Sequence, residues 1–544
     1  FGYRSDGYDG VLPLVITPTL VGIETVNLAV TGVERAETIL NLQDASGLKA
    51  VSLNNAIEPV GGYIVNLGSI VQPVNTVVVS NILKALESMS VSGTQSGYPA
   101  VQFSYAAGAL VGENSVTLNL DGASLYSLSI GRDTSGSGPF YEVGLEGYEH
   151  LTINVNRASS IGFLNLPMDS GSAGSITITG GADLQLGVLM LGDQQPVYPD
   201  YSGIYQTDGR LASIDASALT GNLTLVLSNI MDVGKAGSSS VEQDVTVTGG
   251  SGDDTFVLHD VMQAGDRVLG GGGTDTLQFC SGSGLNSVAE SIEVAALRAM
   301  DIFGVFGEDF SVIVDFSYLA SVDRIELSNA TPTATLGYRE AGFDQPSVNF
   351  TMTSLRVGQA ASITIQHAST GNCDIADSVI QAALATDTAS DTLGVTIADG
   401  KNLDFRFNFT IDTAFASSGA SSFEHLTITD TDAESNAVEL NDFAQFTGSI
   451  TLKGGKAGTF LNFDVDTDGA DVTQQRYLGH GDSVANPWDA LDLVGNYHPV
   501  QQGLLGLATD GSAIDFAAGH IHDVGNLATQ VRLGAASINA AATD

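Results

Sequence analysis

The sequence predicts an all-β, elongated protein of repetitive parallel β-helix or β-roll-like modules and sandwich-like modules, with two short helices. Three observations lead to this prediction. Short runs of Val, Leu, Ile and Thr alternate with polar residues, the chain contains 64 glycines to make tight turns, and strand–turn–strand units recur along it. A single unit of this kind cannot bury its apolar face alone, so we expect the units to stack into a rod.

The clearest repeat is a pair of segments in the two halves of the chain. The run YEHLTI, which begins at Tyr148, returns as FEHLTI, which begins at Phe423. GSITITGG from Gly174 follows the first run, and GSITLKGG from Gly448 follows the second. Because both order and approximate spacing are kept, the sequence indicates an internal duplication.

Two segments favour short helices, one before each copy. SNILKALESM begins at Ser80, a residue type preferred at helix N-caps, and CDIADSVIQAALA begins at Cys373. Both contain several strong helix formers, such as Ala and Leu.

These features divide the chain into four predicted modules. Residues 1–75 hold an N-terminal strand segment and the first β repeat, 76–285 form β module 1, 286–370 form a connecting β module, and 371–544 form β module 2, the duplicate of module 1. The apolar run from Val11 to Val21 is strongly β-forming, and we expect it to pair with an edge strand of this chain or of a neighbouring subunit.

The net charge limits which kinds of partner the protein can bind. With 19 Lys and Arg against 62 Asp and Glu, the formal net charge is −43, which repels nucleic acid. Two explanations of the acidity stay open: it keeps an extracellular protein soluble, or bound calcium neutralises it.

No leader and no apolar run of about 18 residues are visible, so we expect no membrane span. Cys280 and Cys373 are expected to be buried apolar residues, with a disulfide as the alternative.

Two nonapeptides between the copies carry the sharpest motif. GGSGDDTFV from Gly249 and GGGGTDTLQ from Gly270 both fit G-G-x-G-x-D-x-U-x, a pattern of calcium-binding β-helix repeats. Asp254 and Asp275 take the sixth position, and the apolar eighth residues should point into the core. The first module therefore ends in a predicted calcium site, which the second module lacks.

The residue types explain this prediction. Glycines allow tight turns that direct carbonyl oxygens inward, and the aspartates add charge, which together suit the oxygen-only shell of Ca²⁺. Asp253 and Asp266 are candidate additional ligands. We expect about one to three ions. The motifs start 21 residues apart, which is not a multiple of nine, so they cannot form one uninterrupted roll. Glycine turns without metal are the alternative.

A second candidate calcium loop is DVDTDG. Its carboxylates Asp464, Asp466 and Asp468 alternate before a glycine, as at the start of an EF-hand loop. The twelfth position is Gln475 rather than Glu, and no flanking helices are expected. An ordinary solvated turn is the alternative.

Residues 213–279 resemble the repeats-in-toxin (RTX) calcium-binding proteins, particularly bacterial surface-layer proteins. SIDASALTGNLTLVL, VTVTGGSGDDTFVL and AGDRVLGGGGTDTLQF follow one another in that stretch. The resemblance implies export, calcium-dependent folding outside the cell and self-assembly. It implies a ligand set made of the carboxylates of Asp254 and Asp275 with the carbonyls of Gly249, Ser251, Gly270 and Gly272.

The predicted function is a calcium-stabilised structural subunit of a surface layer or extracellular filament, a homo-oligomer that could contact cell-surface polysaccharide. It is not expected to be an enzyme, because the chain has neither H-E-x-x-H nor G-x-S-x-G and His520 and His522 lack an indicated third ligand. An adhesin or carbohydrate-binding protein is the alternative, with Trp488 as a possible platform or a core residue. An RTX hydrolase is the third.

Overall fold

A computed structural model describes the chain in segments. The described residues are 14–30, 37–55, 76–93, 100–132, 147–166, 173–190, 211–227, 244–258, 261–280, 283–298, 310–328, 348–365, 378–398, 409–412, 423–431, 437–441, 449–454, 460–464 and 514–517.

The chain divides into two compact units. Unit 1 comprises Phe1–Leu277 and Leu285–Ile292, and unit 2 comprises Gln278–Gly284 and Glu293–Asp544. Both units are built almost wholly from parallel strands, as the alternating sequence predicts. Among the described residues, none of the helices has the length and apolar character that crossing a membrane requires.

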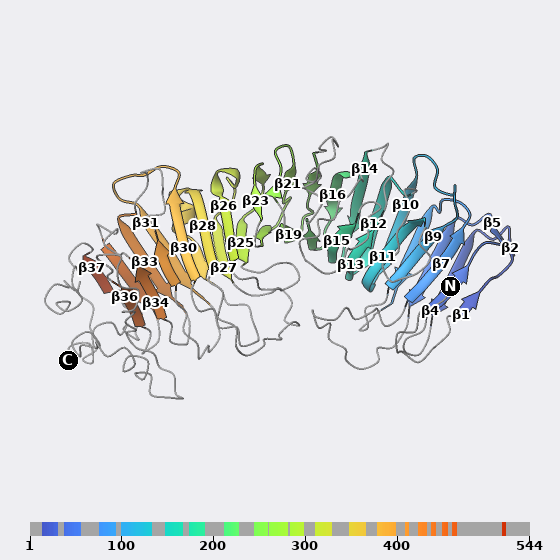
Figure 1. Ribbon diagram of the computed structural model, residues 1–544, viewed down its shortest axis with the longest axis horizontal. Coiled ribbons are helices and arrows are strands. Elements are labelled where there is room, and N and C mark those ends of the chain that lie inside the picture. The colour runs from blue at the N-terminus through green and yellow to red at the C-terminus, as the bar shows by residue number, and fades with distance from the viewer. Residues whose placement is uncertain are drawn as a thin grey trace, which may run out of the picture. The chain divides into compact units, whose positions relative to one another are not determined.

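Unit 1 is a parallel β-helix, in which each coil adds one strand to each of two sheets (Figure 1). The neighbouring strands of its first sheet pair in parallel. The strands of this sheet are, in order, β1 (Leu14–Ile16), β4 (Glu37–Asn41), β7 (Thr76–Ile82), β9 (Ala100–Tyr105), β11 (Ser124–Arg132), β13 (Ser159–Asn165), β15 (Leu184–Met190), β17 (Leu223–Val226) and β19 (Thr255–Leu258).

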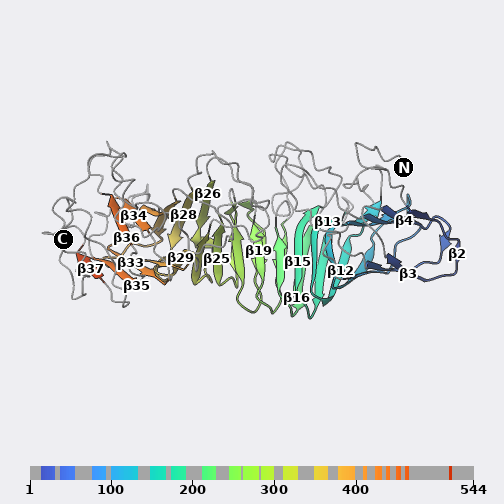
Figure 2. The same ribbon diagram turned by 90° about the horizontal axis from the view of Figure 1, so that it is seen from below.

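The second sheet of unit 1 has ten strands (Figure 2). They are β3 (Thr25–Val30), β6 (Ala50–Asn55), β8 (Ser88–Ser92), β10 (Ser115–Asp121), β12 (His150–Arg157), β14 (Gly174–Gly180), β16 (Leu211–Leu219), β18 (Thr246–Thr248), β21 (Arg267–Leu269) and β24 (Ala289–Glu290). The remaining short strands are β2 (Leu20–Val21), which pairs with β5 (Ala45–Ser46), and β20 (Val261–Met262), β22 (Thr276–Phe279) and β23 (Gly284–Leu285).

Unit 2 repeats the same architecture. One row of parallel strands contains β25 (Val294–Arg298), β27 (Arg324–Ser328), β29 (Ile363–Ile365), β31 (Thr392–Ile397), β33 (His425–Asp430) and β35 (Ser449–Gly454), with β37 (Ile514–Ala517) antiparallel to β35. A six-stranded sheet contains β26 (Phe310–Asp315), β28 (Val348–Leu355), β30 (Ser378–Leu384), β32 (Phe409–Asp412), β34 (Ala437–Asn441) and β36 (Phe460–Asp464).

The core lies inside the coils, because alternate residues of each strand point inward. In β12, Leu151, Ile153 and Val155 are at most 1% exposed, while the residues between them are partly exposed. Stacking places like residues above one another: Leu118 lies opposite Ile153, which lies opposite Ile178. Each coil therefore completes the apolar interior that its neighbour leaves open.

The predicted duplication has a structural counterpart. His150 lies opposite Ser175 in unit 1, and His425 lies opposite Ser449 in unit 2, so the two repeated segments pair in the same register. The aromatic residue at the start of each repeat, Tyr148 or Phe423, is fully buried. The two copies thus make the same kind of parallel pairing, β12 with β14 and β33 with β35.

Two short helices are described, but not where the sequence placed them. They are the 3₁₀-helix η1 (Phe316–Tyr318) and the helix α1 (Val357–Ala360). The segment from Ser80 instead completes β7, where Asn81 has a φ of 54° at a register shift against β9, and then enters β8. The described part of the segment from Cys373 is mainly strand β30. Both helix predictions are wrong, because pairing with neighbouring strands outweighs local helix propensity.

The N-terminal apolar run pairs within the chain. β1 is parallel to β4 and β2 is parallel to β5. All three residues of β1 are nevertheless exposed, with Leu14 at 57% and Val15 at 53%, and Val21 of β2 is 77% exposed. The division into four modules stays a prediction.

A buried tyrosine pair makes unit 1 sensitive to alkali. The Tyr148 hydroxyl lies 2.7 Å from that of Tyr105 and accepts a hydrogen bond from the Leu86 amide at 2.8 Å. Burial raises the pKa of Tyr148 from 10.0 to about 12. The folded state therefore keeps this proton to higher pH than the unfolded chain does, so its contribution to stability is intact below pH 10.0 and is lost as the pH rises through about 12.

We expect the free energy of unfolding to fall over that interval by at most about 1.4 kcal/mol per pH unit from this group. Urea unfolding at a series of alkaline pH values measures the slope. Tyr148→Phe, which places the residue of the second repeat at this position, should reduce the slope. An equal slope in the variant would show that Tyr148 does not cause the loss of stability over this pH interval.

Candidate metal centre

The nonapeptide turns occupy the same position in successive coils of unit 1. Thr246 of β18 lies opposite Arg267 of β21, and Val268 of β21 lies opposite Ala289 of β24. Each of these pairs is separated by 21 residues, which is therefore the length of one coil here. The two nonapeptides start 21 residues apart, rather than at a multiple of nine, because they occupy the same position in successive coils of this length.

The apolar residues of the motif lie as predicted. Phe256 and Leu277 at the eighth positions have no exposed surface and lie in the core. The aspartates two residues earlier, Asp254 and Asp275, are also fully buried. A buried carboxylate needs strong partners, because transfer of its charge out of water is costly.

Asp254 finds its partners in the backbone. Its Oδ1 accepts a hydrogen bond from the Leu223 amide of the preceding coil at 2.7 Å, and its Oδ2 accepts one from the Gly250 amide at 2.6 Å. Burial raises the pKa of Asp254, an effect that these two amides oppose. Asp254 therefore closes its own turn and binds that turn to the coil before it.

Asp275 and Asp253 make the same kind of contact between the two nonapeptides. Asp275 Oδ1 accepts a hydrogen bond from the Asp254 amide at 2.9 Å. In the opposite direction, Asp253 Oδ1 accepts one from the Thr274 amide at 2.8 Å. The two turns are thus linked through both members of the Asp253–Asp254 pair.

Asp266 stands apart from the nonapeptides and acts similarly. It is 2% exposed, and its Oδ1 and Oδ2 each accept a backbone hydrogen bond at 2.9 Å, from Val245 and Gln263. Its own carbonyl accepts a hydrogen bond from the Ser287 hydroxyl of the next coil. Asp266 therefore joins the coil on each side of it.

The glycines of the motif are required by close stacking of the turns. A Cβ atom on Gly249 would lie 1.9 Å from the carbonyl oxygen of Gly270, and one on Gly250 would lie 2.3 Å from that of Leu219. The Gly272 amide donates directly to the Gly250 carbonyl at 2.9 Å. The stacked turns leave no space for a Cβ atom at Gly249 or at Gly250.

These contacts decide how well the motif fits an ion. Ca²⁺ needs six to eight oxygen ligands at 2.3–2.6 Å, which would have to separate the two turns. The turns are instead bonded to each other directly, and both oxygens of Asp254 and of Asp266 receive backbone N–H groups. The hydrogen bonds of Asp254 would therefore compete with an ion interposed between the nonapeptides. Calcium binding, at the nonapeptides and elsewhere in the chain, stays a prediction.

Three carboxylates that the sequence did not single out do converge in unit 2. Ligand atoms of Asp387, Asp391 and Glu424 lie within 4.8 Å of one another, the one such group within the described segments. Hydrogen bonds account for the buried Asp391 and the half-buried Glu424. Asp391 accepts from the amide and hydroxyl of Thr388, at 2.5 and 2.7 Å, and Glu424 Oε2 accepts from the Asp391 amide at 2.8 Å.

The same corner occurs in unit 1, where the repeated Glu-His pair is again involved. Glu149 Oε2 accepts a hydrogen bond from the Asn114 amide at 2.6 Å, and the His150 amide donates to the Asn114 carbonyl. In unit 2, the His425 amide donates to the Asp391 carbonyl. The duplicated Glu-His pair was the sequence signal for this structural role.

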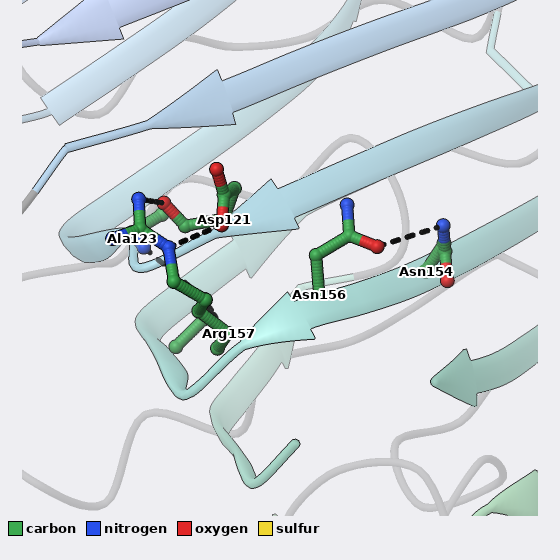
Figure 3. Close-up of polar contacts among 6 residues, drawn as sticks. Asp121, Ala123, Asn154, Asn156 and Arg157 are labelled. Atoms are coloured by element: carbon green, nitrogen blue, oxygen red, sulfur yellow. Dashed lines mark hydrogen bonds and ion pairs between the residues drawn. The ribbon is translucent and has the colours of Figure 1, made fainter. Parts of the chain in front are cut away.

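Polar side chains also join coils on the outer face of the ten-stranded sheet (Figure 3). Arg157 forms an ion pair with Asp121 of the preceding coil and donates to its carbonyl at 3.1 Å. Asn154 donates to Asn119 of the preceding coil at 3.2 Å and to Asn156 at 3.4 Å.

Other predicted residues are placed only in part. Asp464 ends β36, whereas Asp466 and Asp468 lie outside the described residues, as do Trp488, His520 and His522. Cys280 is buried as predicted, and Cys373 lies outside the described residues. Neither the calcium loop at Asp464 nor the aromatic platform is tested.

Comparisons with known proteins return no match: no family model, no curated protein and no solved structure is similar to this chain.

The buried Glu149 should be a stabilising residue. Glu149→Ala leaves the Asn114 amide without its acceptor, which we expect to lower the free energy of unfolding by about 1–3 kcal/mol. Glu149→Gln keeps one acceptor oxygen and should lose less. Urea denaturation measures both. Glu113→Ala is the control, since its side chain is 67% exposed; a loss as large as that of Glu149→Ala would show that the buried acceptor is not what matters.

Proposed function

We propose that this chain is a structural subunit of an extracellular assembly, a bacterial surface layer or filament, rather than an enzyme. The observation that carries the proposal is the use of its polar residues. The buried acids Asp254, Asp266 and Glu149 all bind backbone amides and join or close coils. A chain whose buried acids stabilise its own coils is suited to a structural role.

The charge and the RTX resemblance support the same proposal. Subunits with a formal charge of −43 repel one another, so close packing needs cations between them. Calcium is the cation that the resemblance implies, and exposed carboxylates on facing subunits would bind it. Export and localisation at the cell surface belong to this proposal too.

Assembly should depend on calcium. Purified protein with millimolar Ca²⁺ is expected to form ordered arrays or filaments in electron microscopy, and chelation should return soluble protomers whose circular dichroism is unchanged. Mg²⁺ at the same ionic strength is the control for simple screening. Protein that stays monomeric in every cation condition would refute the proposed function.

The exposed apolar strands at the start of unit 1 are the proposed contact between subunits. Val15 is 53% exposed on β1, which pairs with β4, and Val21 is 77% exposed on β2, which pairs with β5. Val15→Lys and Val21→Lys should raise the critical concentration for assembly by about tenfold or more, because each places a charge in an apolar contact.

Light scattering against protein concentration measures that change. Val111→Lys is the matched control, because Val111 is 74% exposed and lies outside the N-terminal strands. Unchanged assembly in the two N-terminal variants would exclude this surface.

A glycan-binding surface is the second candidate. Thr117, Thr152 and Thr177 align across neighbouring strands of the ten-stranded sheet, and so do Asn119, Asn154 and Thr179. These partly exposed side chains form rows of hydroxyl and amide groups about 4.8 Å apart. Binding of monomeric protein to a neutral polysaccharide that Thr152→Val weakens would favour this candidate over self-assembly.

A further inference from the structure

We propose that the nonapeptide aspartates of this chain are coil-joining acceptors of backbone hydrogen bonds, and that the two turns hold together without calcium. The motif that resembles a calcium site would here have a different role. This inference concerns the folding of unit 1 and does not depend on how the protein assembles.

The coil length explains the spacing of the two nonapeptides. Nonapeptides on opposite sides of a roll follow one another at intervals of nine, whereas these two are separated by one complete 21-residue coil. Gly249 therefore lies directly against Gly270 of the next coil, and Gly270 lies against Ser291 of the coil after it. The Gly-Gly pairs recur because stacked coils approach closely at this corner.

Backbone hydrogen bonds also join the two turns. The Gly272 amide donates to the Gly250 carbonyl at 2.9 Å, and the Thr276 amide donates to the Asp254 carbonyl at 2.8 Å. These are direct bonds between successive coils, one before and one after the aspartate. An ion between the coils would have to break them, and would have to be worth more than the bonds it replaced.

The carboxylates are oriented toward backbone amides. Asp254 binds the amides of Leu223 and Gly250, and Asp275 in turn binds the amide of Asp254. Each aspartate thus accepts an N–H group from the coil before it, at a corner where the strand ladder has ended. Charge-assisted bonds of this kind are stronger than bonds between neutral groups, which explains the use of Asp at a fully buried position.

Substitution and chelation together test the proposal. In thermal unfolding of the whole chain, Asp254→Asn should lower the midpoint by about 2–6 °C, because the amide group cannot accept from both N–H groups. Asp275→Asn should act in the same direction. The shift should be the same, within about 1 °C, in millimolar Ca²⁺ and in excess EDTA.

Asp215→Asn is the matched control, because Asp215 is exposed and, within the described segments, accepts its hydrogen bond from the Ser217 amide two residues away; its midpoint should not move. If the Asp254→Asn shift appears in Ca²⁺ and vanishes in EDTA, the carboxylate is a calcium ligand and the proposal fails. The proposal also fails if calorimetric titration shows that Asp254→Asn binds fewer Ca²⁺ ions than the wild type.

A measurement on the wild type covers the case in which the variants do not fold. Amide hydrogen exchange followed by mass spectrometry should show equal protection of peptides from 244–258 and 261–280 with Ca²⁺ and with EDTA. Peptides from 147–166 supply the reference. Loss of protection at the turns on chelation overturns the proposal. Because the measurement uses soluble protomers, protein that keeps this protection but never assembles would refute only the proposed function.

Discussion

The protein depends on hydrogen bonds between successive coils. Parallel strands satisfy one another's amides and carbonyls along their length, but each coil must also turn corners, where the ladder ends. At those corners the amides of Asn114, Leu223 and Val245 donate their hydrogen bonds to the carboxylates of Glu149, Asp254 and Asp266. The acids are buried because the corners are buried.

The burial of these acids at the corners changes how the net charge of the chain is interpreted. A net charge of −43 suggests a surface covered with carboxylates, yet several of the acids lie inside the coils and bind backbone amides. Interior and exposed acids therefore have different roles in this chain. An interior acid stabilises a coil, whereas an exposed acid repels other acidic molecules or, with a bound cation, attracts them. Composition alone cannot distinguish them.

The sequence predicted the all-β class and the duplication because both are carried by local alternation and by repeated letters. It failed for SNILKALESM and for the segment from Cys373, whose described part is mainly β30. Alanines and leucines favour a helix there locally, but Ile380, Ala382 and Leu384 are buried and the strand pairs with β28. The nonapeptides were rightly placed at turns with Phe256 and Leu277 in the core. The partners of their aspartates could not be predicted, because Leu223 and Asp254 are 31 residues apart and meet only through coiling.

The coil of 21 residues sets the step in which such a chain can change length. Side chains alternate between inside and outside, so the gain or loss of a single residue in a strand exchanges the two faces. The gain or loss of one whole coil keeps glycine stacked on glycine and aspartate beside aspartate at the corner. Gly249 lies against Gly270 in this way, and Asp254 is bonded to Asp275. Insertion or removal of a complete 21-residue coil at this corner would therefore preserve the stacking of the turns, whereas a change of one residue would not.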